Sequence, residues 1–338
     1  MLKDKFNRTI KYLRISLTES CNLHCFYCRP NQDKTYTSCQ SYLTPDEMLL
    51  ITRVFSELGV SHVRLSGGEP LLKKDICLLV KGIGRLSGIK DVSLTTNGIL
   101  LKKFAPSLKN AGLHRLNISL DSITPSKFKE ITGGGDLKKV LQGIDASLKY
   151  GLTPIKLNMV VMRGINDDEI IPMIKFCLKK RLILRLLEFM PIGNSSSDVK
   201  ERHMPAKEIR EKVAQHFPLE KSTLRGPGPA SYEYVKGDGL MIGFIHAVSQ
   251  HFCKTCNRVR LLSSGKLHLC LGHEDQVDLA AVIRTPGVSI EDLKETIQAA
   301  VWSKPSVHRF NKSGSTANKR IMSSIGGEEH SIGIAISH

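Results

Sequence analysis

The first segment with distinctive chemistry is a group of three cysteines near the N-terminus. Within eight residues the chain places Cys21, Cys25 and Cys28 in a C-x3-C-x2-C pattern. A redox-active pair needs only two thiols, and a structural zinc ion needs four closed ligands, for which His24 is a candidate. Because the consecutive residues His24 and Cys25 rarely face one ion, the pattern favours an iron–sulfur cluster. Such a cluster normally takes four thiolates, so three would leave one iron open for chemistry.

A second group of three cysteines lies near the C-terminus. Cys253, Cys256 and Cys270 form a C-x2-C-x13-C pattern. Taken by itself, and extended by His273 to C-x2-C-x13-C-x2-H, this pattern predicts a Cys3His zinc site. The whole chain has nine cysteines, and its polar N-terminus lacks the apolar core of a signal peptide. A disulfide framework is therefore not expected, and metal binding is the more natural use of both groups.

The elements that must position the first group are six strand patterns, which alternate with helical patterns between residue 11 and about residue 190. The strands are expected at residues 11–17, 62–66, 91–95, 115–120, 154–161 and 181–189. Capping residues mark two of the helix starts, Thr44 with Glu47 and Asn166 with Glu169. This alternation predicts a parallel sheet, and right-handed crossovers would curl it into a complete or partial barrel.

Polar motifs stand at or near the C-terminal ends of these strands, the face that carries the active site in barrel enzymes. The first cysteine group follows the first strand. The other motifs are Gly67-Gly68-Glu69-Pro70, Thr95-Thr96-Asn97-Gly98, Asn117–Asp121, Lys156-Leu157-Asn158 and Glu188–Pro191. Their gathering at one end of the sheet predicts an active site there.

The pattern changes after about residue 225. Short strands are expected at residues 231–235, 240–245, 258–262 and 266–270, followed by a helix at residues 289–301. We therefore expect two domains. Residues 1–225 would form the barrel domain, and residues 226–338 a smaller domain that carries the second cysteine group.

Composition limits the class of protein. The chain has 338 residues, 41% of them hydrophobic, which suits a folded protein of about two domains rather than a disordered one. No apolar run reaches the roughly 20 residues that cross a bilayer, so we expect a cytoplasmic protein without a membrane partner. The 49 Lys and Arg against 32 Asp and Glu give a net charge of +17, which favours an anionic ligand. No zinc-finger, homeodomain or RNP signature is present, so we expect no nucleic-acid partner.

The segment from Cys21 to Cys28, with the Gly-Gly-Glu-Pro motif, resembles the radical S-adenosylmethionine (radical SAM) superfamily. The resemblance implies an α/β fold, a partial (βα)6 TIM-type barrel of the radical SAM type with a C-terminal α+β extension closing the barrel. It implies that the first three cysteines bind a [4Fe–4S] cluster whose open iron binds SAM. Cleavage of SAM would yield a 5′-deoxyadenosyl radical, and the protein would position this cofactor. The residues implied in SAM binding are Tyr27, Gly68, Ser119 and Met190.

The segment around the second cysteine group resembles the GTP 3′,8-cyclases, the first enzymes of molybdenum cofactor biosynthesis. The likeness covers Phe252–Leu261, Gly265–Leu267 and Cys270-Leu271, and it extends over nearly the whole chain. In place of zinc, it implies a second [4Fe–4S] cluster on these cysteines, which contacts the guanine of GTP. Arg258 and Arg260 lie two apart on an expected strand, so they share a face and suit a triphosphate. The implied GTP site comprises Arg14, Arg64, Thr95, Lys156, Arg258, Val259 and Arg260, with Arg185 as a further candidate.

By the same resemblance, GTP lies between the two clusters. The deoxyadenosyl radical would take the C3′ hydrogen of the ribose, and the C3′ radical would attack guanine C8 to give 3′,8-cyclo-7,8-dihydro-GTP. The residues implied in catalysis are Arg258, Arg260, Gly326 and Gly327, the last two as the Gly-Gly tail of the family. The family also implies an electron donor such as flavodoxin or ferredoxin, cyclic pyranopterin monophosphate synthase as the next pathway enzyme, and allows a homodimer.

Three features depart from the family pattern. His62 stands where many members have lysine, which predicts a weaker or pH-dependent phosphate contact. Gly133-Gly134-Gly135 replaces the more usual Gly-Arg-Gly, which we expect to change a loop locally. Eleven residues, with Glu328 and Glu329 first, follow Gly327, where the family typically ends. This extension would leave the active-site cavity through an opening or hold the Gly-Gly outside it.

Two alternatives stay open at the level of sequence. One is another radical SAM enzyme with an auxiliary iron–sulfur cluster, such as a peptide-modifying maturase, which would not need Arg258 and Arg260. The other is a basic RNA-binding protein with a structural zinc site, which predicts zinc without iron and salt-dependent RNA binding. Analysis of iron, sulfide and zinc in anaerobically purified protein would separate them.

Overall fold

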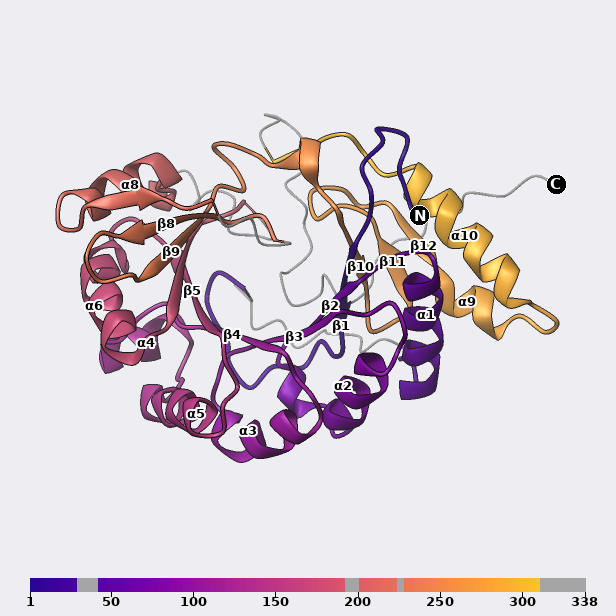
Figure 1. The fold of residues 1–338 in the computed structure, drawn as a ribbon, viewed down its shortest axis with the longest axis horizontal. Coiled ribbons are helices and arrows are strands. Elements are labelled where there is room, and N and C mark those ends of the chain that lie inside the picture. Colours follow the sequence, from indigo (N-terminus) through magenta and orange to yellow (C-terminus); the bar gives the residue numbers. More distant parts are fainter. Residues whose placement is uncertain (29–41, 192–200, 224–227, 311–338) are drawn as a thin grey trace.

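The computed structural model describes residues 1–28, 42–191, 201–223 and 228–310, and its strands form one mixed sheet. The six central strands run parallel and in chain order, and they make the curved wall in Figure 1. They are β1 (Tyr12–Ser16), β2 (His62–Ser66), β3 (Asp91–Thr96), β4 (Arg115–Ser119), β5 (Ile155–Val161) and β6 (Ile183–Glu188). Strands β1 and β6 do not pair with each other, so this wall is a partial barrel, as expected.

Helices cover the outer face of the wall (Figure 1), with one or more helices between successive strands. They are α1 (Pro45–Glu57), α2 (Ile76–Gly84), α3 (Leu101–Asn110), α4 (Pro125–Ile131), α5 (Leu137–Lys149) and α6 (Ile170–Lys180), with the short 3-10 helices η1 (Pro70–Leu72) and η2 (Asp167–Glu169). Between helices and sheet lies a continuous apolar core. No helix in the described residues has the length and apolar character needed to span a membrane.

The C-terminal part of the chain extends the sheet at both of its open edges (Figure 1). Beside β6 lie β9 (Met241–Ile245), which is parallel to it, then β8 (Ser231–Val235) and β7 (Leu219–Lys221). Beside β1 lie β10 (Arg258–Leu261), which is parallel to it, then β11 (Lys266–His268) and β12 (Gln276–Asp278). The remaining elements are α8 (Ala206–Ala214), η4 (Cys253–Thr255), α9 (Leu279–Arg284) and α10 (Ile290–Trp302).

The alternation of side chains along the strands gives the sheet two chemically different faces. In β1, Leu13 and Ile15 are fully buried under the helices, whereas Arg14 between them points to the concave face and is only partly buried. Residues that pair in register share a face, so the pairing of Arg14 with both Arg64 and Arg260 brings three arginines to the concave side. A barrel interior is normally filled by apolar side chains. This one is polar, which suits a ligand-binding wall.

Most of the expected elements are present, and one expected cap is wrong. Thr44 caps α1 in a full capping box with Glu47. Asn166 makes no cap bond, because its side chain instead accepts from Met162 N and donates to the carbonyls of Asp121 and Val160. This residue therefore fastens the loop after β5 to the end of β4. The sequence analysis also missed α8, α9, β7 and β12, which are short or weakly periodic.

Candidate active site

The first cysteine group lies in the loop that follows β1. Cys21, Cys25 and Cys28 are partly buried and form no disulfide. Backbone bonds dock the loop on the end of α4, from His24 N to Thr132 O (3.0 Å) and from Phe26 N to Ile131 O (3.2 Å). Burial, then the charge of Asp121 and the other two thiols, raises the pKa of Cys25 well above its usual value. The three sulfurs therefore converge where thiolates need a cation, which fits a metal centre.

The Gly-Gly-Glu motif after β2 supports this loop directly. Gly68 N donates to Thr18 O (2.7 Å) and Glu69 N donates to Ser20 O (2.8 Å). A Cβ on Gly68 would run into the carbonyl oxygens of Ser20 and Glu19. The glycine is therefore required by the segment that leads into Cys21. Its contact with SAM stays a prediction.

Glu69 and Asn97 link the ends of β2 and β3 to the cysteine loop; both belong to motifs noted in the sequence, where neither was assigned a role of its own. The buried Glu69 carboxylate accepts from Leu71 N (3.0 Å), Thr96 Oγ1 (2.7 Å) and Asn97 N (2.8 Å). Burial nevertheless raises its pKa to about 7. Asn97 Nδ2 in turn donates to Cys21 Sγ at 3.8 Å. This chain of contacts orients Cys21 from the sheet.

The residues predicted to bind SAM lie around the same end of the sheet. The Tyr27 hydroxyl donates to Asp121 Oδ2 (2.5 Å), whose other oxygen accepts from Val160 N (2.8 Å). Burial raises the pKa of Asp121 to about 6. Ser119 ends β4 and Met190 follows β6, and both side chains are partly buried. Because the Tyr27 hydroxyl already donates to Asp121, we expect Tyr27 to contact a ligand through its ring or its backbone.

Four arginines gather on the concave face at the β10 side of the sheet. Arg14 pairs in register with Arg64 of β2 and with Arg260 of β10, and Arg258 lies two residues before Arg260 on the same face. Burial, then the charges of Arg260 and Arg64, lowers the pKa of Arg14 well below its usual value. Within the described part of the chain, no carboxylate forms an ion pair with any of the four. Like charges gathered in this way without a counter-ion predict a polyanionic ligand.

The facing wall of the sheet carries a second basic group. Lys156 Nζ lies 3.1 Å from the hydroxyl of Tyr232, and Arg185 Nη2 donates to Asn117 Oδ1 (2.9 Å). Arg185 is only 5% exposed, and burial lowers its pKa to about 10. A Cβ on Gly243, the register partner of Arg185, would meet the Tyr232 ring at 2.8 Å. The glycine therefore makes room for this cluster, and Tyr232 is a wall residue that the sequence did not reveal.

Several buried polar atoms on this concave face lack a hydrogen-bond partner among the described residues. They are Tyr12 Oη, Arg14 Nε, Thr95 Oγ1, Asn158 Oδ1 and Arg185 Nε. Buried polar groups are satisfied in the great majority of cases, so a run of exceptions along neighbouring strands indicates a ligand site. Thr95, Arg14 and Arg185 were all singled out from the sequence.

The second cysteine group lies at the opposite end of the same strands. Cys256 stands just before β10, which runs parallel to β1, and Cys270 follows β11, which runs antiparallel to β10. Both therefore lie near the start of β1, whereas Cys21 lies beyond its end. The five residues of β1 between them span roughly 16 Å. The arginines of the concave face thus lie between the two cysteine groups.

Positively charged side chains lie near the second cysteine group. Arg258 Nη2 lies 3.9 Å from Cys256 Sγ. Burial acts to raise the pKa of Cys256, but Arg258 and Lys304 lower it to about 7. Lys304 is buried as well, and sequence reasoning missed it. A thiolate, the form that binds metal, is therefore favoured at Cys256.

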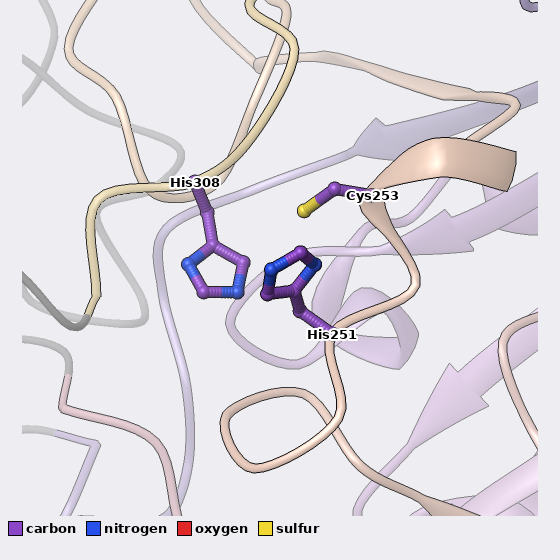
Figure 2. A group of neighbouring side chains, drawn as sticks. All are labelled: His251, Cys253 and His308. Atoms are coloured by element: carbon purple, nitrogen blue, oxygen red, sulfur yellow. The ribbon is translucent and has the colours of Figure 1, made fainter.

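The zinc site predicted with His273 is not assembled in the structure. His273 Nε2 instead bonds to Val307 O (2.9 Å). Among the described residues, the group whose ligand atoms all lie within 4.8 Å of one another is His251, Cys253 and His308, whose side chains point toward one another in Figure 2. Neither cysteine group meets that spacing. A tetrahedral zinc ion with Zn–S bonds of 2.3 Å would hold two cysteine sulfurs roughly 3.8 Å apart. In an iron–sulfur cluster the cysteine sulfurs lie farther apart, because each sulfur binds a different iron.

One predicted GTP-site residue, Val259, is placed differently from the prediction. Val259 lies on the opposite face of β10 from its arginine neighbours and is 1% exposed in the apolar core, so only its backbone faces the concave side. Gly326 and Gly327 lie outside the described residues. His62, the departure from the family pattern, bonds through Nδ1 to Ser61 Oγ (2.9 Å), and burial lowers its pKa. A neutral imidazole there fits the expected weakening of a phosphate contact at neutral pH.

Glu188, at the end of β6, fastens the loop that leads to the second cysteine group. Its carboxylate accepts from Val248 N (2.8 Å), Ser249 N (2.9 Å) and Ala206 N (2.7 Å), and from the Ser249 hydroxyl. Burial acts to raise its pKa, but the imidazole of His203 at 3.9 Å and the hydrogen bonds from Ser249 and Ala206 lower it to about 2. The glutamate thereby joins the barrel to the C-terminal part.

Replacing Glu188 with glutamine is expected to lower the free energy of unfolding by about 1.5–3 kcal/mol at neutral pH, the range for hydrogen bonds to a charged group. The folded pKa of about 2 lies below the ordinary 4.5, so this contribution is complete above about pH 4.5 and declines toward pH 2. Denaturant unfolding at pH 7 and pH 3.5 should therefore give a smaller difference at pH 3.5. Glu220→Gln, at a surface pair with Lys236, should cost less than about 0.5 kcal/mol. A Glu188 effect that grows on acidification would contradict this assignment.

Comparison with known proteins finds relatives for both parts of the chain. A model of the radical SAM superfamily matches residues 15–177, and a model described as Molybdenum Cofactor Synthesis C matches residues 182–310. A protein of Hydrogenovibrio crunogenus named GTP 3′,8-cyclase is 45% identical over 330 residues, which cover 96% of this chain and 99% of that protein. A protein of the same name from Syntrophomonas wolfei is 42% identical, with coverage of 96% and 99%.

Solved structures share the fold at low sequence identity. Streptococcus suis SuiB bound to the precursor peptide SuiA matches with a TM-score of 0.61 and 16% identity, over 94% of this chain and 71% of that one. Methylornithine synthase (PylB) matches with a TM-score of 0.52 and 13% identity, over 86% and 82%. These likenesses show the partial barrel and carry no argument about substrate.

Proposed function

The chain belongs to the GTP 3′,8-cyclase family of radical SAM enzymes, and we propose that its two cysteine groups hold [4Fe–4S] clusters on either side of the GTP site. It is an enzyme that converts GTP to 3′,8-cyclo-7,8-dihydro-GTP at the start of molybdenum cofactor biosynthesis, with SAM and iron–sulfur as cofactors. The observation that carries the site proposal is the row of uncompensated arginines between cysteine groups at opposite ends of β1.

The residues present fit these cofactors. Cys21, Cys25 and Cys28 leave one iron of a cluster open, and the ends of β2, β3 and β4 stand around that loop. When bound, the cluster and SAM supply the 5′-deoxyadenosyl radical that removes the C3′ hydrogen of the ribose. Asn97 orients Cys21, and Tyr27, Gly68, Ser119 and Met190 are proposed to hold SAM.

The concave face is proposed to bind the nucleotide through its charges and its unpaired polar atoms. Arg14, Arg64, Arg258 and Arg260 supply planar donors for the triphosphate, and Lys156 and Arg185 face them from the other wall. The Thr95 hydroxyl is free to bond a ribose or base oxygen. Fixing phosphates and ribose in this way holds C3′ and the guanine in a reactive orientation. The side chain of Val259 does not take part, although its backbone lies in the same strand.

The alternatives require features that the described chain does not support. A peptide-modifying enzyme has no use for four partly buried arginines that form no ion pair with a carboxylate of the described residues. An RNA-binding protein with a structural zinc on the second cysteine group would use His273 as fourth ligand, but His273 Nε2 is bonded to Val307 O, and the compact group of His251, Cys253 and His308 includes only one of the three cysteines. The division into residues 1–225 and 226–338 remains our proposal, with the second part placing β10 and the second cysteine group beside β1.

The partners follow from the reaction. We propose that GTP is the substrate and that an electron donor such as flavodoxin or ferredoxin reduces the first cluster. We further propose that cyclic pyranopterin monophosphate synthase takes the product, that the enzyme acts in the cytoplasm, and that a homodimer is compatible with its function.

The Gly-Gly segment gives a separate prediction, based on sequence alone. Ending the chain at Gly327 should keep or raise cyclase activity, because it removes Glu328 and Glu329, two negative charges that a triphosphate would repel. Ending the chain at Ile325 should abolish cyclisation while iron content is unchanged. Product assays of the two truncations decide this, and normal cyclisation by the shorter chain would exclude a catalytic role for Gly326 and Gly327.

The experiment that tests the proposed function is an anaerobic assay of the reconstituted chain with GTP, SAM and dithionite. The expected products are 3′,8-cyclo-7,8-dihydro-GTP, identified by mass spectrometry, with 5′-deoxyadenosine and methionine. ATP in place of GTP should give no cyclised nucleotide. Cleavage of SAM without any cyclised product would refute the assignment of the substrate.

A further inference from the structure

Lys304 is the most deeply buried lysine of the C-terminal part, and none of the roles above uses it. It follows α10 and is 2% exposed, and its ammonium group donates to the carbonyl of Leu269, the residue before Cys270. Within the described residues no carboxylate forms an ion pair with it. An ammonium group buried without a counter-ion is costly, so the fold holds this charge in place for an anion.

The groups around Lys304 indicate which anion this is. Its ammonium group bonds to the residue next to Cys270, and burial lowers its pKa, while the thiols of Cys256 and Cys270 act to raise it and Arg8 and Arg258 act to lower it. The groups that act to raise it are therefore both members of the second cysteine group. Three thiolates with an oxidised [4Fe–4S] core carry a net charge of about −1, and about −2 after one-electron reduction. That charge would lie beside the Lys304 ammonium.

The position of Lys304 is fixed by contacts independent of any cluster. Arg8 donates to Pro305 O (2.6 Å), to Ser306 O (2.9 Å) and to Cys253 O (2.8 Å). It is itself held by a buried ion pair with Asp4 (2.6 Å). The N-terminal segment thus clamps the Lys304 segment onto the loop of the second cysteine group.

We propose that Lys304 is the buried counter-charge of the second iron–sulfur cluster, and that it raises the reduction potential of this cluster. The inference rests on the proposed cluster at Cys253, Cys256 and Cys270. A nearby positive charge stabilises the reduced cluster, which is the more negative form, over the oxidised one. Lys304 is a positioning residue in this account, since it acts on the electronic state of the cluster and touches no reacting atom.

The test compares three single variants in a chain whose first cysteine group is replaced by alanines. In this chain only the second cluster contributes to the measured potential. Lys304→Met removes the charge and the hydrogen bond, and Lys304→Gln removes the charge but keeps an N–H donor. Lys254→Met is the matched control, because Lys254 lies between Cys253 and Cys256 but is exposed. The readouts are the midpoint potential of the cluster, the dissociation constant of GTP, and the unfolding of the cluster-free chain.

Both Lys304 variants are expected to lower the equilibrium constant for reduction of the cluster at least tenfold. For a one-electron couple this is a shift of the midpoint potential by about 59 mV to more negative values. Lys254→Met should shift it less, because solvent screens that charge. The cluster-free Lys304→Met chain should be at least as stable as its parent, since an unpaired buried charge is gone. GTP affinity should change less than twofold.

Other results would overturn the proposal in distinguishable ways. An unchanged potential in Lys304→Met, with lower stability, would show that Lys304 is only a structural contact to Leu269. A normal potential in Lys304→Gln alone would assign the effect to the hydrogen bond. A large loss of GTP affinity with an unchanged potential would assign the charge to the triphosphate. Failure of the parent chain to assemble four irons would refute the second cluster itself, and the proposal with it.

Discussion

Replacing Cys256 with alanine is expected to abolish the cyclised nucleotide while reductive cleavage of SAM continues. The two cysteine groups lie at opposite ends of β1, and within the described ranges no backbone bond that holds the first group comes from the second. The loop of the first group is held by α4, by Gly68 and by Asn97, all far from Cys256. Loss of the second cluster should therefore leave SAM chemistry intact and remove only the anchor of the guanine.

The measurement is a product analysis of the reconstituted variant with GTP, SAM and dithionite. We expect 5′-deoxyadenosine without cyclised nucleotide, with loss of cyclisation by at least a factor of 10², the scale of losing a positioned reactant. Cys25→Ala should lose both products, and Cys77→Ala, a lone cysteine on α2, should lose neither. Normal cyclised product from Cys256→Ala would contradict the role assigned to the second group.

Replacing Arg260 with alanine is expected to weaken GTP binding by about 1.5–3 kcal/mol, roughly 10- to 150-fold in Kd. Arg260 pairs in register with Arg14, and burial followed by the charge of Arg258 lowers its pKa to about 10. No carboxylate of the described residues forms an ion pair with it, so we expect the bound triphosphate to compensate its charge. Calorimetric titration with GTP measures the loss, and SAM binding should barely change.

The free energy of unfolding of the Arg260→Ala variant distinguishes a loss of GTP binding from a folding defect. Because Arg260 stands among like charges, its removal should leave the free energy of unfolding unchanged or raise it. Arg85→Ala, an exposed arginine at the end of α2 on the outer side of the barrel, should affect neither GTP binding nor stability. Equal losses of GTP and SAM affinity, together with lower stability, would mean that Arg260 supports the fold instead.

Local patterns were enough to predict most of the barrel. The strand at residues 62–66 and the capping box of Thr44 with Glu47 appear in the structure as the sequence indicated. Both depend on side-chain alternation and on capping chemistry, which act over a few residues. The cap expected at Asn166 was wrong because its side chain bonds to the backbone of Met162, Val160 and Asp121 instead, and the capping pattern does not reveal these competing partners.

The candidate site was predictable where residues act in pairs or groups. The spacing of Arg258 and Arg260 was sufficient to place them on one face, and the structure adds that β10 pairs with β1, about 246 residues earlier in the chain. The sequence did not indicate the role of charged residues that stand outside any motif. Lys304 and Arg8 take their roles from contacts across the fold, and each looks like an ordinary surface charge in the sequence.

The measurement that tests the account most directly is the metal content of the anaerobically reconstituted chain and of two single variants. The account predicts about eight irons and eight sulfides per wild-type chain, four per site, with no stoichiometric zinc. Cys25→Ala and Cys256→Ala should each retain about four irons, because each disables a different cysteine group. One zinc per chain with four irons or fewer, and the loss of that zinc in Cys256→Ala, would contradict the two-cluster site.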